Sequence, residues 1–314
     1  MNKIEEYKNK LSSKENLLDL MYENNDEYLK KSSYIEKHSF YEGQKDGIDI
    51  DVCKYNMFIY GTCYEKIATK TPFKVFKQNG TKYELLIDSY QNNISYRGDT
   101  AINCTSVLTQ IMKYENSGRI SKKVINEGLK RSCMYNDLQE NLEEHAKLCY
   151  SVGNYYPIPF LKDKDGRSTS LNRAKWHCSS IGYKVNFSDD MSVFLEDIKQ
   201  YFETREKRGK VSNHISDFYN DWIKDSGEGF EGWKCFVNTY YFNSFVDKDY
   251  KPIRFWNIKQ NIIDEAKNGD QQALISYINN YLEAVNTAIT NRTEVVLEKV
   301  KKVSNNHVIG QLLP

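Results

Sequence analysis

The stretch from residue 150 to residue 184 combines positive charge with aromatic rings. It holds six cations and two anions, so its formal charge is +6 − 2 = +4, whereas the whole chain of 314 residues carries only +1. Lysine and arginine bind phosphate groups, and aromatic faces stack on bases. The segment therefore favours contact with a nucleic acid or a nucleotide. The alternative is a solvated hairpin whose rings lie in the core.

Individual roles follow from the chemistry of each side chain in this segment. We expect phosphate contact from three cations, stacking from two rings, and positioning of backbone or phosphate by two amides. In that order the predicted binding residues are Arg167, Arg173 and Lys175, then Tyr155 and Trp176, then Asn154 and Asn172. A chain charge of +1 supplies no global field for a polyanion, so any such contact depends on this local patch.

Candidates for catalysis are few. The seven cysteines are scattered and form no C-x-x-C pair, which indicates free thiols and argues against a structural zinc site. Motifs of phosphate-binding loops, zinc proteases and serine hydrolases do not occur. His145 and His177 are the candidates for a general base. We predict no cofactor, and a divalent metal stays open for a hydrolase.

Periodicity and turn signals predict the elements that position these residues. Helical spacing of apolar residues occurs in 1–31, 137–150, 189–205 and 260–303. Residues 47–112 are expected to be β-rich, with a hairpin turn at Asn79-Gly80. Two prolines in 155–160 predict an extended strand at a sheet edge, and 235–242 predicts a strand that pairs with 251–256. The glycine-rich stretch 227–232 is expected to be a loop, because a dinucleotide fingerprint needs a strand before it and a helix after it.

The predicted class is α+β, mostly helical, with short antiparallel hairpins in a single main domain. We divide the chain into an N-terminal helical extension (1–46), an α+β core domain (47–257) and a C-terminal helical segment (258–314). The amphipathic terminal helices can pack on the core, bind a protein partner or support self-association. No apolar run approaches the roughly 20 residues of a spanning helix, and charges occupy the start of the chain. We therefore expect a cytoplasmic protein without membrane contact.

Several short motifs resemble a known family. Tyr150-Ser151-Val152-Gly153-Asn154, then Ile158-Pro159-Phe160, then Thr169-Ser170-Leu171-Asn172-Arg173-Ala174-Lys175 are similar to an uncharacterised bacterial family of unknown-function domains, over roughly 47–257. That resemblance implies no established activity. Gly153-Asn154, Asn172 and Lys175 also look like the skeleton of HNH-type nuclease domains from modification-dependent restriction systems, which implies a role in bacterial defence against phage. Tyr150 stands where those domains have a histidine, so catalysis would be lost or relocated.

Three functions therefore stay open at this point. The first is contact with nucleic acid or nucleotide through 150–184. The second is a protein-interaction or regulatory module without catalysis. The third is a degenerate or relocated HNH-like hydrolase. Whether the chain is an enzyme is undecided by its residues.

Overall fold

The computed structural model describes residues 2–14, 16–43, 50, 53–64, 73–78, 82–88, 94–104, 107–108, 111, 134–162, 168–169, 190–206, 223 and 226–303. Helices make up most of this part of the chain, as the sequence predicts. Among the helices described there, none has the length and apolar character that crossing a bilayer requires.

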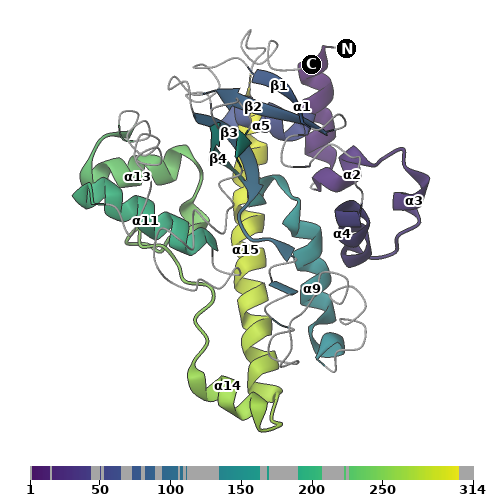
Figure 1. Ribbon diagram of the computed structural model, residues 1–314, viewed down its shortest axis with the longest axis vertical. Coiled ribbons are helices and arrows are strands. Elements are labelled where there is room, and N and C mark those ends of the chain that lie inside the picture. The colour runs from purple at the N-terminus through teal and green to yellow at the C-terminus, as the bar shows by residue number, and fades with distance from the viewer. Residues whose placement is uncertain are drawn as a thin grey trace.

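Helix α15 (Gln272–Lys302) forms the axis of the molecule. Its 31 residues correspond to a length of about 46 Å, and it runs along most of the long axis in Figure 1. Its buried side chains recur every three or four residues, for example at Leu274, Ile278, Leu282 and Val285. The helix contacts α9, α5, α1 and a short 3-10 turn, η2, so elements from most of the chain meet on it.

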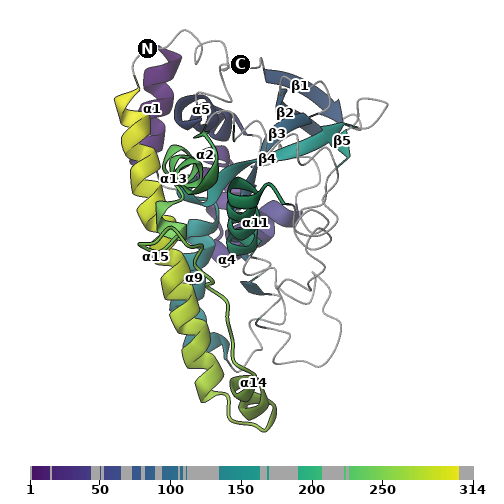
Figure 2. The ribbon, with the colours of Figure 1, turned by 90° about the vertical axis from the view of Figure 1, so that its left-hand side faces the viewer.

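Helix α9 (Tyr135–Cys149) lies beside α15 in both ribbon views (Figures 1 and 2). The predicted helix over 137–150 is thus confirmed. The face expected to be apolar is buried, since Leu138, Leu142 and His145 are each at most 1% exposed. The predicted helical stretch 260–303 is also confirmed, because it contains α14 (Gln260–Lys267) and α15. The two helices are separated at Gly269, whose φ is +98°.

Arg292, in the C-terminal half of α15, is a fully buried cation, with 1% of its surface exposed. All five of its N–H donors have acceptors. These are the carbonyl oxygens of Tyr241 (2.9 Å), Gly153 (2.6 Å), Tyr155 (2.7 Å) and Tyr240 (3.1 Å), and the hydroxyl of Tyr64 (2.7 Å). The guanidinium carbon also lies 4.7 Å from the centre of the Phe242 ring. One side chain therefore joins three segments that are far apart in sequence.

The turn η2 (Val152–Asn154) packs directly against α15 next to Arg292. A Cβ atom at Gly153 would overlap the backbone nitrogen of Thr293 and would lie 2.6 Å from the carbonyl oxygen of Ile289. The backbone N–H of Gly153 donates to the Thr293 hydroxyl at 3.2 Å. Glycine is therefore required here because the two backbones touch.

In the described part of the chain, five strands form an antiparallel sheet in the order β1-β2-β3-β4-β5. They are β1 (Phe73–Gln78), β2 (Lys82–Asp88), β3 (Ile94–Thr100), β4 (Tyr155–Lys162) and β5 (Ser168–Thr169). Gln78 lies opposite Lys82, and the predicted turn Asn79-Gly80 falls outside the described residues. The sheet lies at the top of the view in Figure 1.

Strand β4 was expected at a sheet edge, and this prediction needs correction. It lies between β3 and β5, with Pro157 opposite Gly98 and Pro159 opposite Tyr96. However, β5 pairs only with the last two residues of β4. The prolines therefore occupy a part of β4 where one side has no described neighbour, which is where a residue without an N–H is tolerated.

The N-terminal segment is helical but broken into α1 (Lys3–Ser13), α2 (Leu17–Met21), α3 (Asp26–Leu29) and α4 (Tyr34–Gly43). Asn16 and Asn25 cap α2 and α3 by accepting hydrogen bonds from backbone N–H groups. Helix α1 packs against α5 and α15. The question left open by the sequence is thus answered, because the first helix packs on the core.

Two predicted strand regions contain helices instead. Helix α5 (Lys54–Cys63) lies in the stretch expected to be β-rich, and all its residues after Lys54 are buried. A helix buried on every side has no amphipathic period to reveal it. The predicted strand 235–242 belongs mostly to α13 (Gly229–Thr239). Trp233, Phe236 and Val237 share its buried face, and their aromatic and β-branched types suggested a strand.

The neighbouring predictions change accordingly. The stretch 227–232 is a turn only at its start, because Gly229 begins α13 and the φ angles of Gly227 and Gly229 are +88° and +66°. The expected pairing with 251–256 reduces to an isolated bridge between Val246 and Pro252. Helix α13 packs against α11 (Asp190–Thr204), which confirms the predicted helix at 189–205.

We expect Arg292→Met to lower the free energy of unfolding by at least about 3 kcal/mol. The substitution leaves four buried carbonyl groups and one hydroxyl without their donor, and each such group costs about 1–3 kcal/mol. Urea denaturation of the purified chain measures the change. Arg254→Met is the matched control, because Arg254 is exposed, and its loss should cost less than about 1 kcal/mol. Equal losses in the two variants would contradict the central role of Arg292.

Candidate functional site

Two of the predicted binding residues are part of the core. The side chain of Asn154 accepts from the backbone N–H of Ile102 at 3.0 Å and donates to the carbonyl oxygens of Ile102 (3.0 Å) and Cys149 (2.8 Å). Tyr155 is 1% exposed. The expectation that Asn154 positions a phosphate and Tyr155 stacks on a base is therefore corrected. In this conformation both are enclosed by protein, and Asn154 links the end of α9 to the segment after β3.

The remaining members of the basic and aromatic segment lie outside the described residues. These are Arg167, Asn172, Arg173, Lys175 and Trp176, together with the catalytic candidate His177. Their expected roles stay predictions. Asn154 shows why the basic and aromatic pattern of 150–184 was hard to interpret. A polar residue in such a segment can bind a ligand, but it can equally well form hydrogen bonds with buried main-chain groups.

His145 is buried on the inner face of α9 and does not meet solvent. Its Nδ1 lies 3.0 Å from Oδ1 of Asn286 on α15. Burial lowers the pKa of His145 to about 4, although the Asn286 hydrogen bond acts in the opposite direction. A ring that is enclosed by protein cannot reach a bound molecule to accept its proton, although the neutral form is the one that acts as a base. The catalytic expectation for His145 is corrected on this ground.

We expect the protein to lose stability between about pH 6.5 and pH 4 because of His145. In this range the unfolded ring, with its ordinary pKa of 6.5, binds a proton that the folded ring, with a pKa of about 4, does not. The contribution to the free energy of unfolding is fully present above pH 6.5 and decreases by roughly 3 kcal/mol as the pH falls. Urea denaturation at about pH 7 and about pH 4.5 measures it. His145→Gln should lose less stability over the same interval, and an equal loss would show that the ring does not contribute.

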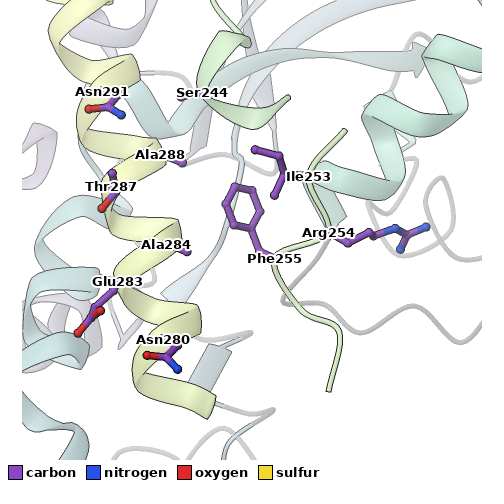
Figure 3. Close-up of a pocket in the computed structure, with 10 residues that line it drawn as sticks. All are labelled: Ser244, Ile253, Arg254, Phe255, Asn280, Glu283, Ala284, Thr287, Ala288 and Asn291. Carbon is purple, nitrogen blue, oxygen red and sulfur yellow. The ribbon is translucent and has the colours of Figure 1, made fainter. Parts of the chain in front are cut away.

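An open groove of about 580 Å³ lies on the opposite, exposed side of α15. One wall is the helix, and the other is the connection that follows the 3-10 turn η4 (Asn243–Phe245) (Figure 3). Ile253, Phe255, Ala284 and Ala288 supply its apolar lining. In Figure 3 the ring of Phe255 points toward α15.

Polar side chains of the groove are available for a ligand. In the described part of the chain, four exposed side chains of the lining have no hydrogen bond or ion pair with another residue: Asn280, Glu283, Thr287 and Asn291. The Ser244 hydroxyl has no partner there either, but it is buried. The four exposed residues follow one another on α15 at spacings of three and four residues. In a folded protein such groups bond either to water or to a bound molecule.

The electrostatics of the groove are mildly acidic. Arg254 donates through Nε to the Glu196 carboxylate at 2.6 Å, and its Nη2 also bonds to that carboxylate. This pair is formally neutral. Glu283 belongs to the lining and has no cationic partner in the described structure, and Figure 3 shows its side chain at the edge of the groove, pointing away from residues 253–255. Anionic ligands such as phosphates are therefore disfavoured here, and ligands with donors or a positive charge are favoured.

Within the described ranges, no three His, Cys, Asp or Glu side chains cluster in a way that would hold a metal ion. The open prediction of a divalent metal thus gains no site among these residues. Sequence reasoning missed the groove residues. The signal was present as the polar stripe Asn280, Glu283, Thr287 and Asn291, which alternates with the apolar face of the same helix.

Of the two resemblances noted in the sequence, comparison with known proteins supports the one to an uncharacterised family. A family model described as "Family of unknown function (DUF6994)" matches residues 96–296. The match includes η2, Arg292 and the whole lining of the groove. No curated protein and no solved structure gives a significant match. The predicted similarity to an uncharacterised family is confirmed, whereas the similarity to HNH nucleases finds no support.

Proposed function

The chain belongs to DUF6994, a family of unknown function, and we propose that it acts as a binding module without catalysis, whose groove beside α15 holds a partner protein. The observation that carries this proposal is the set of four exposed polar side chains, Asn280, Glu283, Thr287 and Asn291, that line the groove and have no partner in the described part of the chain. All four project from one rigid helix, so a ligand meets them without prior rearrangement.

The chemistry of the groove favours binding over catalysis. Proton transfer needs a base and an acid of matched pKa around a reacting atom. The lining has one carboxylate that lacks a partner, that of Glu283, and no histidine or cysteine. His145, the described catalytic candidate, is buried between α9 and α15.

The sequence pattern indicates the amphipathic terminal helices as partner surfaces. The present proposal keeps the C-terminal segment 258–314 but places the partner on the groove side of α15. The buried face of α15 is used by the core, which leaves its exposed face for a partner. We further propose a cytoplasmic location, supported by the scattered cysteines of the sequence, and the α+β class, supported by the antiparallel pairing of the strands.

Site-specific photo-crosslinking in the cells that produce the protein tests the binding role. A benzophenone side chain replaces Asn291 in the groove or, as control, Thr290. Thr290 immediately precedes Asn291, lies about 100° away from it around the same helix and does not line the groove. We expect a discrete covalent adduct from position 291 and none from position 290. No adduct at either position, or the same adducts from both, would argue against the groove as a binding surface.

A second candidate function is contact with nucleic acid through residues 150–184, which is favoured by the local charge of +6 − 2 = +4. Arg167, Arg173 and Lys175 remain the proposed phosphate contacts. Binding of single- and double-stranded DNA and RNA across a salt series measures it. We expect the triple alanine variant of these residues to reduce the slope of log K against log salt by about 2–3.

The control for this experiment removes the same charge elsewhere, by replacing Lys299, Lys301 and Lys302 at the end of α15 with alanine. This variant should keep the affinity and salt slope of the unmodified chain. A binding signal that is absent, or that does not depend on salt, excludes the nucleic-acid role.

A further inference from the structure

We propose that the occupant of the groove is an extended peptide segment of about five residues that carries a lysine or an arginine. This inference rests on the binding role proposed above and names the chemistry of the partner. It is drawn from the length of the groove, from its unpaired hydrogen-bonding groups and from its charge.

The length of the groove matches a short extended chain. Asn280 and Asn291 mark its two ends along α15, and they are separated by eleven steps along the helix, which correspond to about 16 Å at 1.5 Å per residue. Five residues of extended polypeptide span about 17 Å. The groove runs between the helix and the segment 253–255, so a linear ligand can lie parallel to both (Figure 3).

The unpaired groups are suited to a peptide main chain. A carboxamide donates and accepts hydrogen bonds, as a peptide unit does, and hydroxyls do both as well. Asn280 and Asn291 supply two such amides, and Thr287 supplies a hydroxyl. On the opposite wall, the backbone N–H and carbonyl of Phe255 make no hydrogen bond with another residue in the part of the chain that the structure describes. A chain lying between the two walls can therefore form main-chain bonds to both, as in the addition of a strand to an open backbone edge.

The charge of the groove selects a basic segment. Glu283 is the acid without a partner near the middle of the helical wall, and Arg254 on the opposite wall is engaged by Glu196. A lysine or arginine in the peptide meets Glu283 without competing for an existing ion pair. The small side chains Ala284 and Ala288 leave room beside it, and Phe255 offers apolar contact to the neighbouring peptide residue.

Titration of the full chain with peptide pools tests the proposal. The probes are acetylated and amidated pentapeptide mixtures with a fixed central residue, lysine in one pool and glutamate in the other. We expect the lysine pool to bind about two- to fivefold more tightly, the range that an exposed ion pair provides. Glu283→Gln should remove this preference, whereas Glu298→Gln, which changes an exposed glutamate outside the groove, should preserve it.

A second pair of measurements tests the role of the main chain. The lysine pool with N-methylated peptide bonds should bind at least several-fold more weakly, because its backbone has lost its donors. Asn291→Ala should weaken both unmethylated pools by a similar factor, since the amide contacts backbone and not the central side chain.

Three results would overturn the inference. These are equal affinity for the lysine and glutamate pools, equal affinity for the N-methylated pool, and binding of spermidine or a neutral oligosaccharide as tight as that of the lysine pool. If the adduct from position 291 persists while no peptide pool binds, the binding module stands and the peptide inference fails. If both are absent, the groove is not a binding surface.

Discussion

Arg292 introduces a positive charge into the centre of the protein, and the rest of the fold is arranged to satisfy it. Taking a guanidinium out of water costs several kcal/mol unless each donor finds an acceptor. Here four of the five acceptors are main-chain carbonyls and none is a carboxylate. The carbonyl groups come from η2, the start of β4 and the end of α13. These three segments can therefore reach their positions only together with α15.

The close approach of η2 to α15 reinforces this arrangement. Gly153 permits the two backbones to touch, which brings its carbonyl oxygen to Arg292. The same helix presents its opposite stripe to the groove, and Asn291 immediately precedes Arg292 in the chain. The position of a groove side chain is thus set by the packing of the core. A rigid scaffold of this kind lowers the entropic cost of binding a flexible ligand.

The sequence predicts those parts of the fold in which one face is apolar and the other polar. Helices α9, α11 and α15 have this alternation, and each was predicted close to its observed limits. Helix α5 lacks it because every face is buried, and α13 was mistaken for a strand because its buried residues are aromatic or β-branched. The candidate site was predicted poorly. Asn154 is polar but buried, and the groove depends on two segments whose proximity no local pattern encodes.

Helix α15 follows, in the order of synthesis, every element that packs against it. Until the ribosome has extended the chain past residue 292, the carbonyl groups of η2 and β4 have no guanidinium to bond, and the inner face of α9 has no neighbouring helix. Domains generally complete their folding as units during or after translation. The apolar surfaces that pack on α15 therefore stay exposed in the nascent chain until α15 has been synthesised. We expect chaperones to bind the chain during this interval, because the helix that covers these apolar surfaces is synthesised after the segments that carry them.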